Sequence, residues 1–227
     1  MASWMIHLRI ADKLLDKIPG LSPIDFIMGN MAPDSGVPNE DWSAFFPSTK
    51  VSHFRTDDGT FKKEIDLSAY LSRYFTPEQR KNYNENQFSF YLGYYVHLLT
   101  DCLWTQFILA PSREKFAEER AADKAGWIAR MKEDWYDLDF LYLKKHPGFR
   151  AFRAYLGSVG FVNTYMDFFA PDAFDNRREY ITSFYLQEND HLDREYPYLT
   201  EAEADRFVAD AIAEILTTIT EFLIISS

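Results

Sequence analysis

Residues 91–104 read YLGYYVHLLTDCLW, a stretch that is apolar or aromatic almost all the way round but contains His97 and Asp101. A helix that is apolar on every face is buried, so the pattern predicts a long central helix over about 85–109 that stops at Pro111. Side chains at i and i+4 project from the same face of a helix. A buried carboxylate costs several kcal/mol unless it is paired or binds a metal, so something must compensate Asp101.

Helical signals recur along the rest of the chain. Ser3 is a candidate N-cap for a first helix whose apolar residues recur at spacings of three and four up to Ile18. Further helices are expected at 23–28, from 66 or 68 to 74, from 77, over 112–145, and at 148–158, 171–188 and 200–224. Strand-like alternation of useful length and internal repeats are both lacking. We therefore predict an all-α, multi-helix fold that forms a single domain over residues 1–227.

One segment, about 29–60, interrupts this helical pattern. It is dense in Pro, Gly, Ser, Asn and Asp, and loops of this length inside a compact domain are often functional. It contributes Asp34 in APDSG and His53 in SHF. The run Asp57-Asp58-Gly59 resembles a ligand group, but it is ordinary turn chemistry and we interpret it as a turn.

Composition limits the class of function. The formal charge of −11 disfavours a broad basic surface of the kind that binds nucleic acid through its phosphates. The single cysteine, Cys102, excludes a disulfide framework or a thiolate zinc cluster within one chain. No signal peptide and no apolar run of bilayer-spanning length is visible. These features favour a soluble protein of the reducing cytoplasm.

Two interpretations of the His97/Asp101 pair remain open from the helix alone. A histidine bonded to its own helical neighbour, or an aspartate paired with an arginine, is the simpler one, because the spacing by itself is a weak signal. Three other residues favour a metal site: Asp34, His53, and His7, which lies on the inward stripe of the first helix. Imidazole nitrogens and carboxylate oxygens are the ligands that zinc and similar divalent ions accept when thiolates are absent.

The order of these residues is also typical of a known family. His7, GNMAPD at 29–34, SHF at 52–54 and GYYVHLLTD at 93–101 together resemble the zinc-dependent phospholipase C and single-strand-specific nuclease superfamily over roughly the first half of the chain. The resemblance implies an all-helical fold with up to three zinc ions. It assigns one zinc to Asp34, His53, His97 and Asp101, and a second to His7, toward which the Asp101 carboxylate bridges.

The chain departs from that family in its remaining ligands. Family members use a processed amino-terminal tryptophan, whereas Trp4 here follows Met-Ala-Ser. The third zinc takes a histidine shortly after the HxxxD helix and an HxxxE helix, but residues 104–109 contain no histidine and the later ones are His146 and His191. His146 suits a helix C-terminus and His191 has only a lone ExxH pair, so both are expected to be structural.

Carboxylates in the second half offer a possible replacement for the missing third site. They lie in KEDWYDLDFLY, where 134 and 137 share a helical face, and are Asp134, Asp137 and Asp139. A solvated acidic face is the favoured interpretation of this group.

Other residues of the central helix are expected to serve packing. Aromatic side chains could line a lipid pocket, but a central helix needs them as core: Phe88, Phe90, Tyr91, Tyr94 and Tyr95. Gly93 suits the close approach of another helix, and a larger residue there is expected to destabilise the fold by overpacking.

The family resemblance predicts a metal-dependent hydrolase of phosphoesters, with one or two zinc ions or another divalent metal and a metal-activated water as nucleophile. Asp34 is the candidate catalytic residue, as a ligand or as the acceptor of the water's proton. The acidic chain favours a small phosphodiester or a lipid headgroup over nucleic acid. The alternative is a non-catalytic binding protein with a structural or vestigial metal, whose site would be closed by four protein ligands rather than open to solvent.

Overall fold

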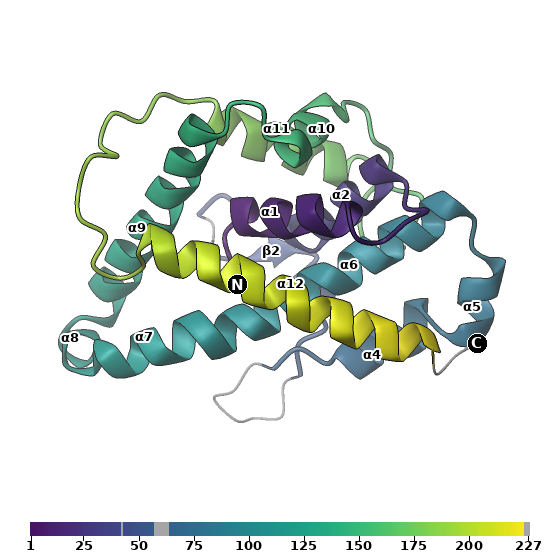
Figure 1. Cartoon of the computed structure of the whole chain (residues 1–227), viewed down its shortest axis with the longest axis horizontal. Coiled ribbons are helices and arrows are strands. Elements are labelled where there is room, and N and C mark those ends of the chain that lie inside the picture. The colour runs from purple at the N-terminus through teal and green to yellow at the C-terminus, as the bar shows by residue number, and fades with distance from the viewer. Residues whose placement is uncertain (42, 57–63, 225–227) are drawn as a thin grey trace.

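The computed structural model describes residues 1–41, 43–56 and 64–224, and it confirms the all-α class (Figure 1). The larger elements are α1 (Trp4–Leu15), α2 (Pro23–Met31), α4 (Leu67–Tyr74), α6 (Glu85–Trp104), α9 (Lys124–Lys145), α10 (Arg150–Gly157), α11 (Ala173–Tyr185) and α12 (Glu201–Ile224). The shorter ones are the 3₁₀ helix η1 (Ala32–Asp34), α3 (Thr49–Ser52), α5 (Pro77–Asn82), the π-helix η2 (Thr105–Leu109), α7 (Ala110–Lys115) and α8 (Ala117–Ala122). Two short strands, β1 (Val37–Pro38) and β2 (Phe45–Phe46), pair antiparallel as a small hairpin. Asp57-Asp58-Gly59 lies outside the described residues.

The α6 helix is central, as its sequence predicts. It packs most extensively against α2 and also contacts α1, α4 and α12 (Figure 1). Most of its aromatic side chains are core rather than pocket wall, since Phe90, Tyr91, Tyr94 and Tyr95 are buried. The close crossing of α2 and α6 depends on two glycines. A Cβ on Gly93 would lie 2.2 Å from the Phe26 carbonyl oxygen, and one on Gly29 would lie 2.1 Å from that of Phe90.

The central helix does not stop at Pro111, so that prediction was wrong. The helical rod continues from α6 through the π-helix η2 into α7, where Pro111 occupies the first turn. Within a continuous helix a proline removes one backbone hydrogen bond and its ring crowds the carbonyl of residue i−4, and the π turn before Pro111 widens the helix at this point. The wider i→i+5 turn precedes the proline, and α7 ends only at Lys115.

The loop at 29–60 is also more regular than its composition suggests. The α2 helix extends through Gly29 to Met31, and η1 continues it to Asp34. The β1/β2 hairpin and α3 then follow, so that both Asp34 and His53 lie at the end of a helical turn rather than in irregular chain.

Capping signals explain several helix boundaries. Thr76 caps α5 with a complete capping box, Asp66 caps α4, and the predicted Thr200/Glu203 pair exchanges hydrogen bonds at the start of α12. Ser3 occupies the N-cap position of α1, as predicted, but its hydroxyl makes no capping hydrogen bond and donates to Asp139 Oδ1 at 2.8 Å instead. The predicted helix over 112–145 is divided at residues 116 and 123 into the end of α7, α8 and α9.

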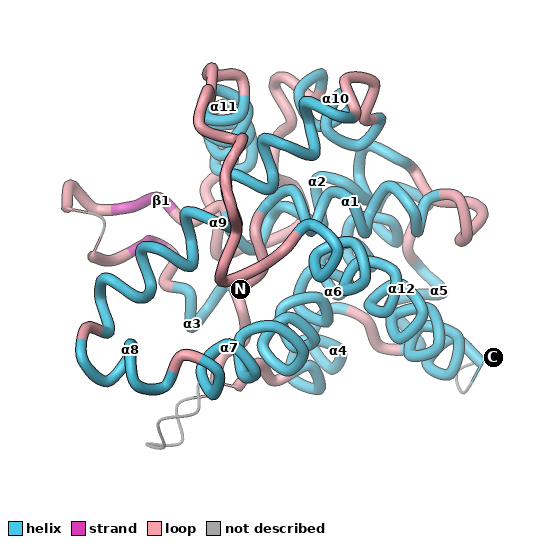
Figure 2. The backbone as a smooth tube through the Cα atoms, turned by 60° about the vertical axis from the view of Figure 1, so that its left-hand side comes forward, coloured by secondary structure: helices cyan, strands magenta, loops and turns pink. Residues whose placement is uncertain are grey.

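The tube view in Figure 2 shows that α3, the hairpin and α9 lie on the same side of the molecule. This arrangement forms one side of a pocket described below. None of the described helices combines the length and apolar character that crossing a membrane requires.

Candidate metal centre

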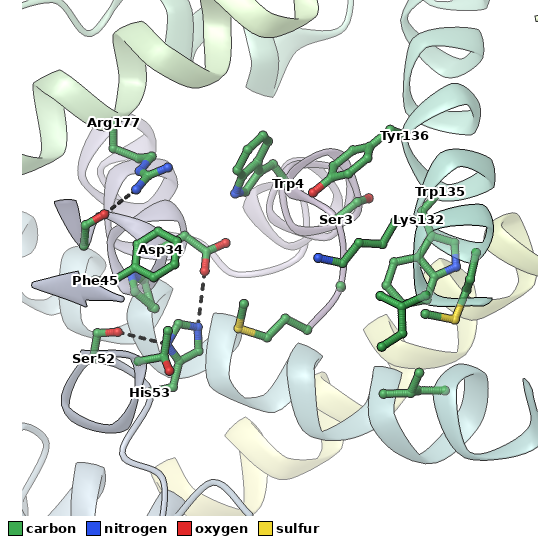
Figure 3. A pocket seen from close by; sticks show the side chains of 18 of the residues that line it. Ser3, Trp4, Asp34, Phe45, Ser52, His53, Lys132, Trp135, Tyr136 and Arg177 are labelled. Atoms are coloured by element: carbon green, nitrogen blue, oxygen red, sulfur yellow. Dashed lines mark hydrogen bonds and ion pairs between the residues drawn. The ribbon is translucent and has the colours of Figure 1, made fainter. Parts of the chain in front are cut away.

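The five residues predicted from the sequence meet in the interior of the fold. His7 comes from α1, Asp34 ends η1, His53 follows α3, and α6 supplies His97 and Asp101. The three imidazoles are completely buried, Asp101 is 1% exposed, and the Asp34 side chain is 9% exposed. The fold therefore joins segments from four elements into one cluster, of which Figure 3 shows Asp34 and His53.

Three of the cluster's atoms are spaced close to the distances expected between ligands of one zinc ion, and Asp34 Oδ1 lies beside one of them. His53 Nε2 lies 3.3 Å from both Asp34 Oδ1 and His97 Nε2, and Asp101 Oδ2 lies 3.7 Å from each of the two imidazole nitrogens. Tetrahedral ligands at the usual zinc bond lengths of about 2.0–2.1 Å are about 3.3–3.4 Å apart. The donor set and these distances thus suit a zinc ion.

A second group of possible ligands lies beside the first. His7 Nε2 is 3.5 Å from Asp101 Oδ1, and the His7 ring stacks on that of His97 with their centroids 3.8 Å apart. Together these three residues offer ligand atoms that lie within 4.8 Å of one another. Neither ring nitrogen of His7 has a hydrogen-bond partner among the described residues, and the same is true of Asp101 Oδ2. Buried polar atoms without partners are costly, so this group also fits a cation.

The surroundings of the imidazoles direct their Nε2 atoms toward the cluster. His97 Nδ1 lies 2.7 Å from the backbone carbonyl of Asn30, which can only accept, so Nδ1 carries the proton. The Ser52 hydroxyl contacts His53 Nδ1 at 2.9 Å and orients that ring as well. This is the arrangement that holds a metal-binding histidine in position. The His97 ring is therefore not bonded to its own helical neighbour, and the described residues place no arginine against Asp101.

The protonation states also suit a metal centre. Burial, together with the neighbouring imidazole of His7, lowers the pKa of His97 to about 3, so this ring is neutral at neutral pH. Burial alone would raise the pKa of Asp34, but the contact with His53 and the nearby imidazoles hold it well below its usual range. Neutral imidazoles and ionised carboxylates are the forms that bind metals.

A pocket of about 730 Å³ reaches the cluster from one side. Asp34 and His53 line it, whereas His7, His97 and Asp101 lie behind them. Its walls include the β1/β2 hairpin and α9 (Figure 3). This volume lies in the range of small-molecule sites, about 300–1,000 Å³.

The three carboxylates of the second half do not form a solvated face, so that interpretation was wrong. Asp134, Asp137 and Asp139 are all buried. Arg194 forms salt bridges of 2.6 Å with both Asp134 and Asp137, while Tyr185 and Ser3 donate to Asp139. Their partners come from distant segments, which a local helical pattern does not reveal. None of the three belongs to the clusters of possible metal ligands among the described residues.

The two late histidines also lie outside the cluster. His146 is exposed at the C-cap of α9, as predicted, and His191 is exposed in the loop before α12. Other residues around the site had no distinct signal. Asn30 lies in GNMAPD and Ser52 in SHF, but neither is a typical metal ligand, and Arg177 belongs to a stretch without any recognisable motif.

Comparison with known proteins supports this assignment. Residues 6–104 match the family model for zinc dependent phospholipase C, which confirms the resemblance predicted from the sequence. The matched range contains all five residues of the cluster. No curated protein and no solved structure matches the chain. The family and the His/Asp cluster together support a zinc-dependent, hydrolase-like role.

Proposed function

We propose that this chain, which carries the zinc dependent phospholipase C family sequence over residues 6–104, is a zinc-dependent hydrolase of phosphoesters. The observation that carries the proposal is the convergence of His53 Nε2, His97 Nε2 and two carboxylates at the inner end of a pocket. With neutral imidazoles and ionised carboxylates, these atoms direct lone pairs toward one another at 3.3–3.7 Å. A proton on His53 Nε2 would satisfy only one of these contacts, whereas a cation between the atoms would satisfy all of them at once.

The residues of the cluster would divide into two sets. Asp34, His53, His97 and Asp101 would hold one metal ion, and His7 would bind a second that shares Asp101. A bound zinc ion supplies Lewis acidity toward a phosphoryl oxygen and a water that is nucleophilic at neutral pH. The lowered pKa of Asp34 favours its role as a ligand over that of a general base.

The pocket side of the cluster gives this hydrolase its substrate access. Asp34 and His53 face the pocket, so a phosphoester can approach that metal position while the buried His7 side excludes water. A small phosphodiester or a lipid headgroup would fit the pocket volume.

A second candidate function is favoured by one feature of the same geometry. Asp34, His53, His97 and Asp101 offer four protein ligands, and four ligands could close a single metal completely, as in structural zinc sites. The chain would then be a helical binding protein with a structural metal. The two functions differ in whether the bound metal turns over a substrate.

The test combines metal content with hydrolysis of bis-p-nitrophenyl phosphate. Wild type, Asp34→Asn and His97→Ala would be loaded with zinc or manganese, freed of excess metal and analysed by elemental analysis. His146→Ala is the matched control, because it removes an exposed imidazole outside the cluster. Each variant would be checked for folding by far-UV circular dichroism.

Hydrolysis by loaded wild type and His146→Ala, with loss of at least about 100-fold in Asp34→Asn, is the expected result. His97→Ala should lose both metal and activity. Stoichiometric metal in wild type without any turnover of phosphodiesters would refute the hydrolase and favour the binding protein. A wild type that binds no divalent metal at all would refute both.

We also propose that residues 1–227 act as one domain, and that it works in the cytoplasm. Both halves of the chain line the pocket, with Asp34 and His53 from the first and Trp127 and Arg177 from the second. Neither half alone would complete the site. The single cysteine is what favours the cytoplasm.

A further inference from the structure

We infer that the pocket binds phosphodiesters that carry at least one further anionic group, and that Arg177 and Lys132 are the residues that select for it. This inference rests on the proposed function, since it names the substrate class of the same site. It is drawn from the charge of the pocket, which is opposite to that of the whole chain.

The charge distribution around the pocket is the first observation. The chain contains 35 acidic and 24 basic residues. Among the described residues that line the pocket, the only acidic side chain is Asp34, which belongs to the metal cluster. The basic side chains that line it come from α7, α8, α9 and α11, and they are Arg113, Arg120, Lys124, Lys132 and Arg177. A cationic cavity in an acidic protein concentrates anionic ligands.

Arg177 is the second observation, because its charge is buried and lacks a counter-ion. The residue is 6% exposed and lines the pocket. One guanidinium nitrogen donates to the carbonyl of Gly36, and the group lies 5.3 Å from the ring centroid of Tyr180. The described residues form no salt bridge to it with a carboxylate. A buried charge without a partner is costly, and an anion in the pocket would compensate it.

Lys132 approaches the pocket from the opposite side. Lys124, Ile128 and Lys132 recur every four residues along α9 and line the pocket together. Figure 3 shows the Lys132 ammonium group directed into the space beside Ser3 and Trp4, across from Arg177. No hydrogen bond or ion pair holds Lys132 within the described part of the chain. Both cations are therefore available to a ligand bound near Asp34 and His53.

Counting charges indicates how anionic the ligand is. One divalent metal would be balanced by the carboxylates of Asp34 and Asp101, and a second at His7 would add positive charge, so the basic side chains stay uncompensated. An ordinary phosphodiester brings one negative charge, and a phosphatidylcholine-type headgroup cancels even that with its own cation. A phosphodiester with an added phosphomonoester or carboxylate matches Arg177 and Lys132 together. Arg113 of α7 and Arg120 of α8, which also line the pocket, would add to the attraction for an anionic ligand.

The experiment compares two lipids that differ only in one phosphomonoester. Phosphonate analogues of dioctanoyl phosphatidylinositol and dioctanoyl phosphatidylinositol 4-phosphate, with a methylene group in place of the glycerol oxygen at the scissile bond, would be titrated into zinc-loaded protein by isothermal calorimetry, where no hydrolysis occurs. The two parent lipids would then be assayed for hydrolysis with zinc-loaded protein. The variants are Lys132→Gln and Arg177→Gln, with Lys144→Gln as the matched control. Lys144 is an exposed lysine of the same helix outside the pocket.

Wild type and Lys144→Gln should bind the phosphorylated lipid about tenfold more tightly than its partner, because the added anion gains charge-assisted hydrogen bonds. Lys132→Gln should reduce this preference about fivefold, and about 0.5 M salt should weaken it further. Binding data for Arg177→Gln would be interpreted only if its unfolding midpoint matches that of wild type, because Arg177 is buried. The outcome for Lys132→Gln decides the test in either case.

Equal affinity for the two lipids, or the same preference in Lys132→Gln and Lys144→Gln, would overturn the inference. The proposed function fails separately. Turnover of both lipids without discrimination would leave the hydrolase standing and refute the anionic selectivity. A preference in binding that depends on Lys132, without any turnover by loaded protein, would support the anion site and refute the hydrolase.

Discussion

Replacing Gly93 by alanine should destabilise the protein and weaken the metal centre at the same time. The added Cβ would lie 2.2 Å from the carbonyl oxygen of Phe26 and 2.9 Å from the backbone nitrogen of Asn30. Contacts between carbon and oxygen are normally about 3.3 Å or longer. The α2 and α6 helices must therefore separate by roughly 1 Å at this crossing. Both clashing atoms belong to the backbone of α2, so no side-chain rotation relieves them.

The expected cost follows from two opposing effects. Overpacking of this kind costs about 1–3 kcal/mol, and the rigid backbone neighbours place Gly93 near the upper end. Alanine is favoured over glycine within a helix by about 1 kcal/mol. The unfolding free energy should therefore fall by about 2 kcal/mol. Urea unfolding followed by far-UV circular dichroism, on metal-free protein, measures this difference.

Gly157→Ala is the matched control. Gly157 is also helical, as the last residue of α10, but a Cβ there would meet nothing within 4 Å. The same substitution should leave stability unchanged or raise it by up to about 1 kcal/mol. A Gly93→Ala protein within about 0.5 kcal/mol of wild type would refute the argument, as would equal losses in both variants.

The same substitution should reach the metal centre through Asn30. Gly93 allows the approach that sets the Asn30 carbonyl 2.7 Å from His97 Nδ1. Loss of such a supporting contact usually weakens metal binding by about 10–100-fold. Zinc titration of the folded variant should show a reduction of at least about tenfold. Unchanged zinc affinity in a destabilised variant would show that the contact does not position His97.

Three further predictions test other parts of the fold. Burial raises the pKa of Asp139 to about 7, partly offset by hydrogen bonds from Tyr185 and Ser3. The native state thus binds more protons than the unfolded state between pH 3.8 and about 7, and wild type should lose stability as pH rises through this window. Asp139→Asn should flatten this loss, gaining up to about 4 kcal/mol relative to wild type by about pH 8; parallel pH profiles in urea unfolding would contradict it. Arg194→Ala leaves the buried carboxylates of Asp134 and Asp137 without their guanidinium and should lower the unfolding free energy by about 2–3 kcal/mol. The control is Arg153→Ala, because Arg153 is exposed and has no ion pair among the described residues; it should lower the unfolding free energy by less than about 0.5 kcal/mol in the same assay. Zinc at about 100 times its Kd should stabilise wild type by about 2.7 kcal/mol and chelation should reverse this; an equal shift in His97→Ala would place the zinc outside the cluster.

The local sequence determined the fold class and the composition of the metal cluster. The all-round apolar pattern of 91–104 identified α6 as central, and the i, i+4 spacing placed His97 and Asp101 on one face. Capping residues such as Thr200 located helix starts for the same reason, because helical periods and caps depend on neighbours within a few positions. The family resemblance, which depends on the order of His7, Asp34 and His53, identified these three as the other members of the cluster. The fold brings them to His97 and Asp101.

Only the tertiary structure decided which distant groups meet. The sequence suggested a solvated acidic face at Asp134 and Asp137, whereas packing buries both against Arg194. It contained no sign that Arg177 and Lys132 share a pocket with Asp34, because they lie on different helices and no local period relates them. The cost of burying a charge depends on its partners in space, and these are set by how the helices pack. Residue types and periods therefore predicted what the centre is made of, and the packing of helices decided what surrounds it.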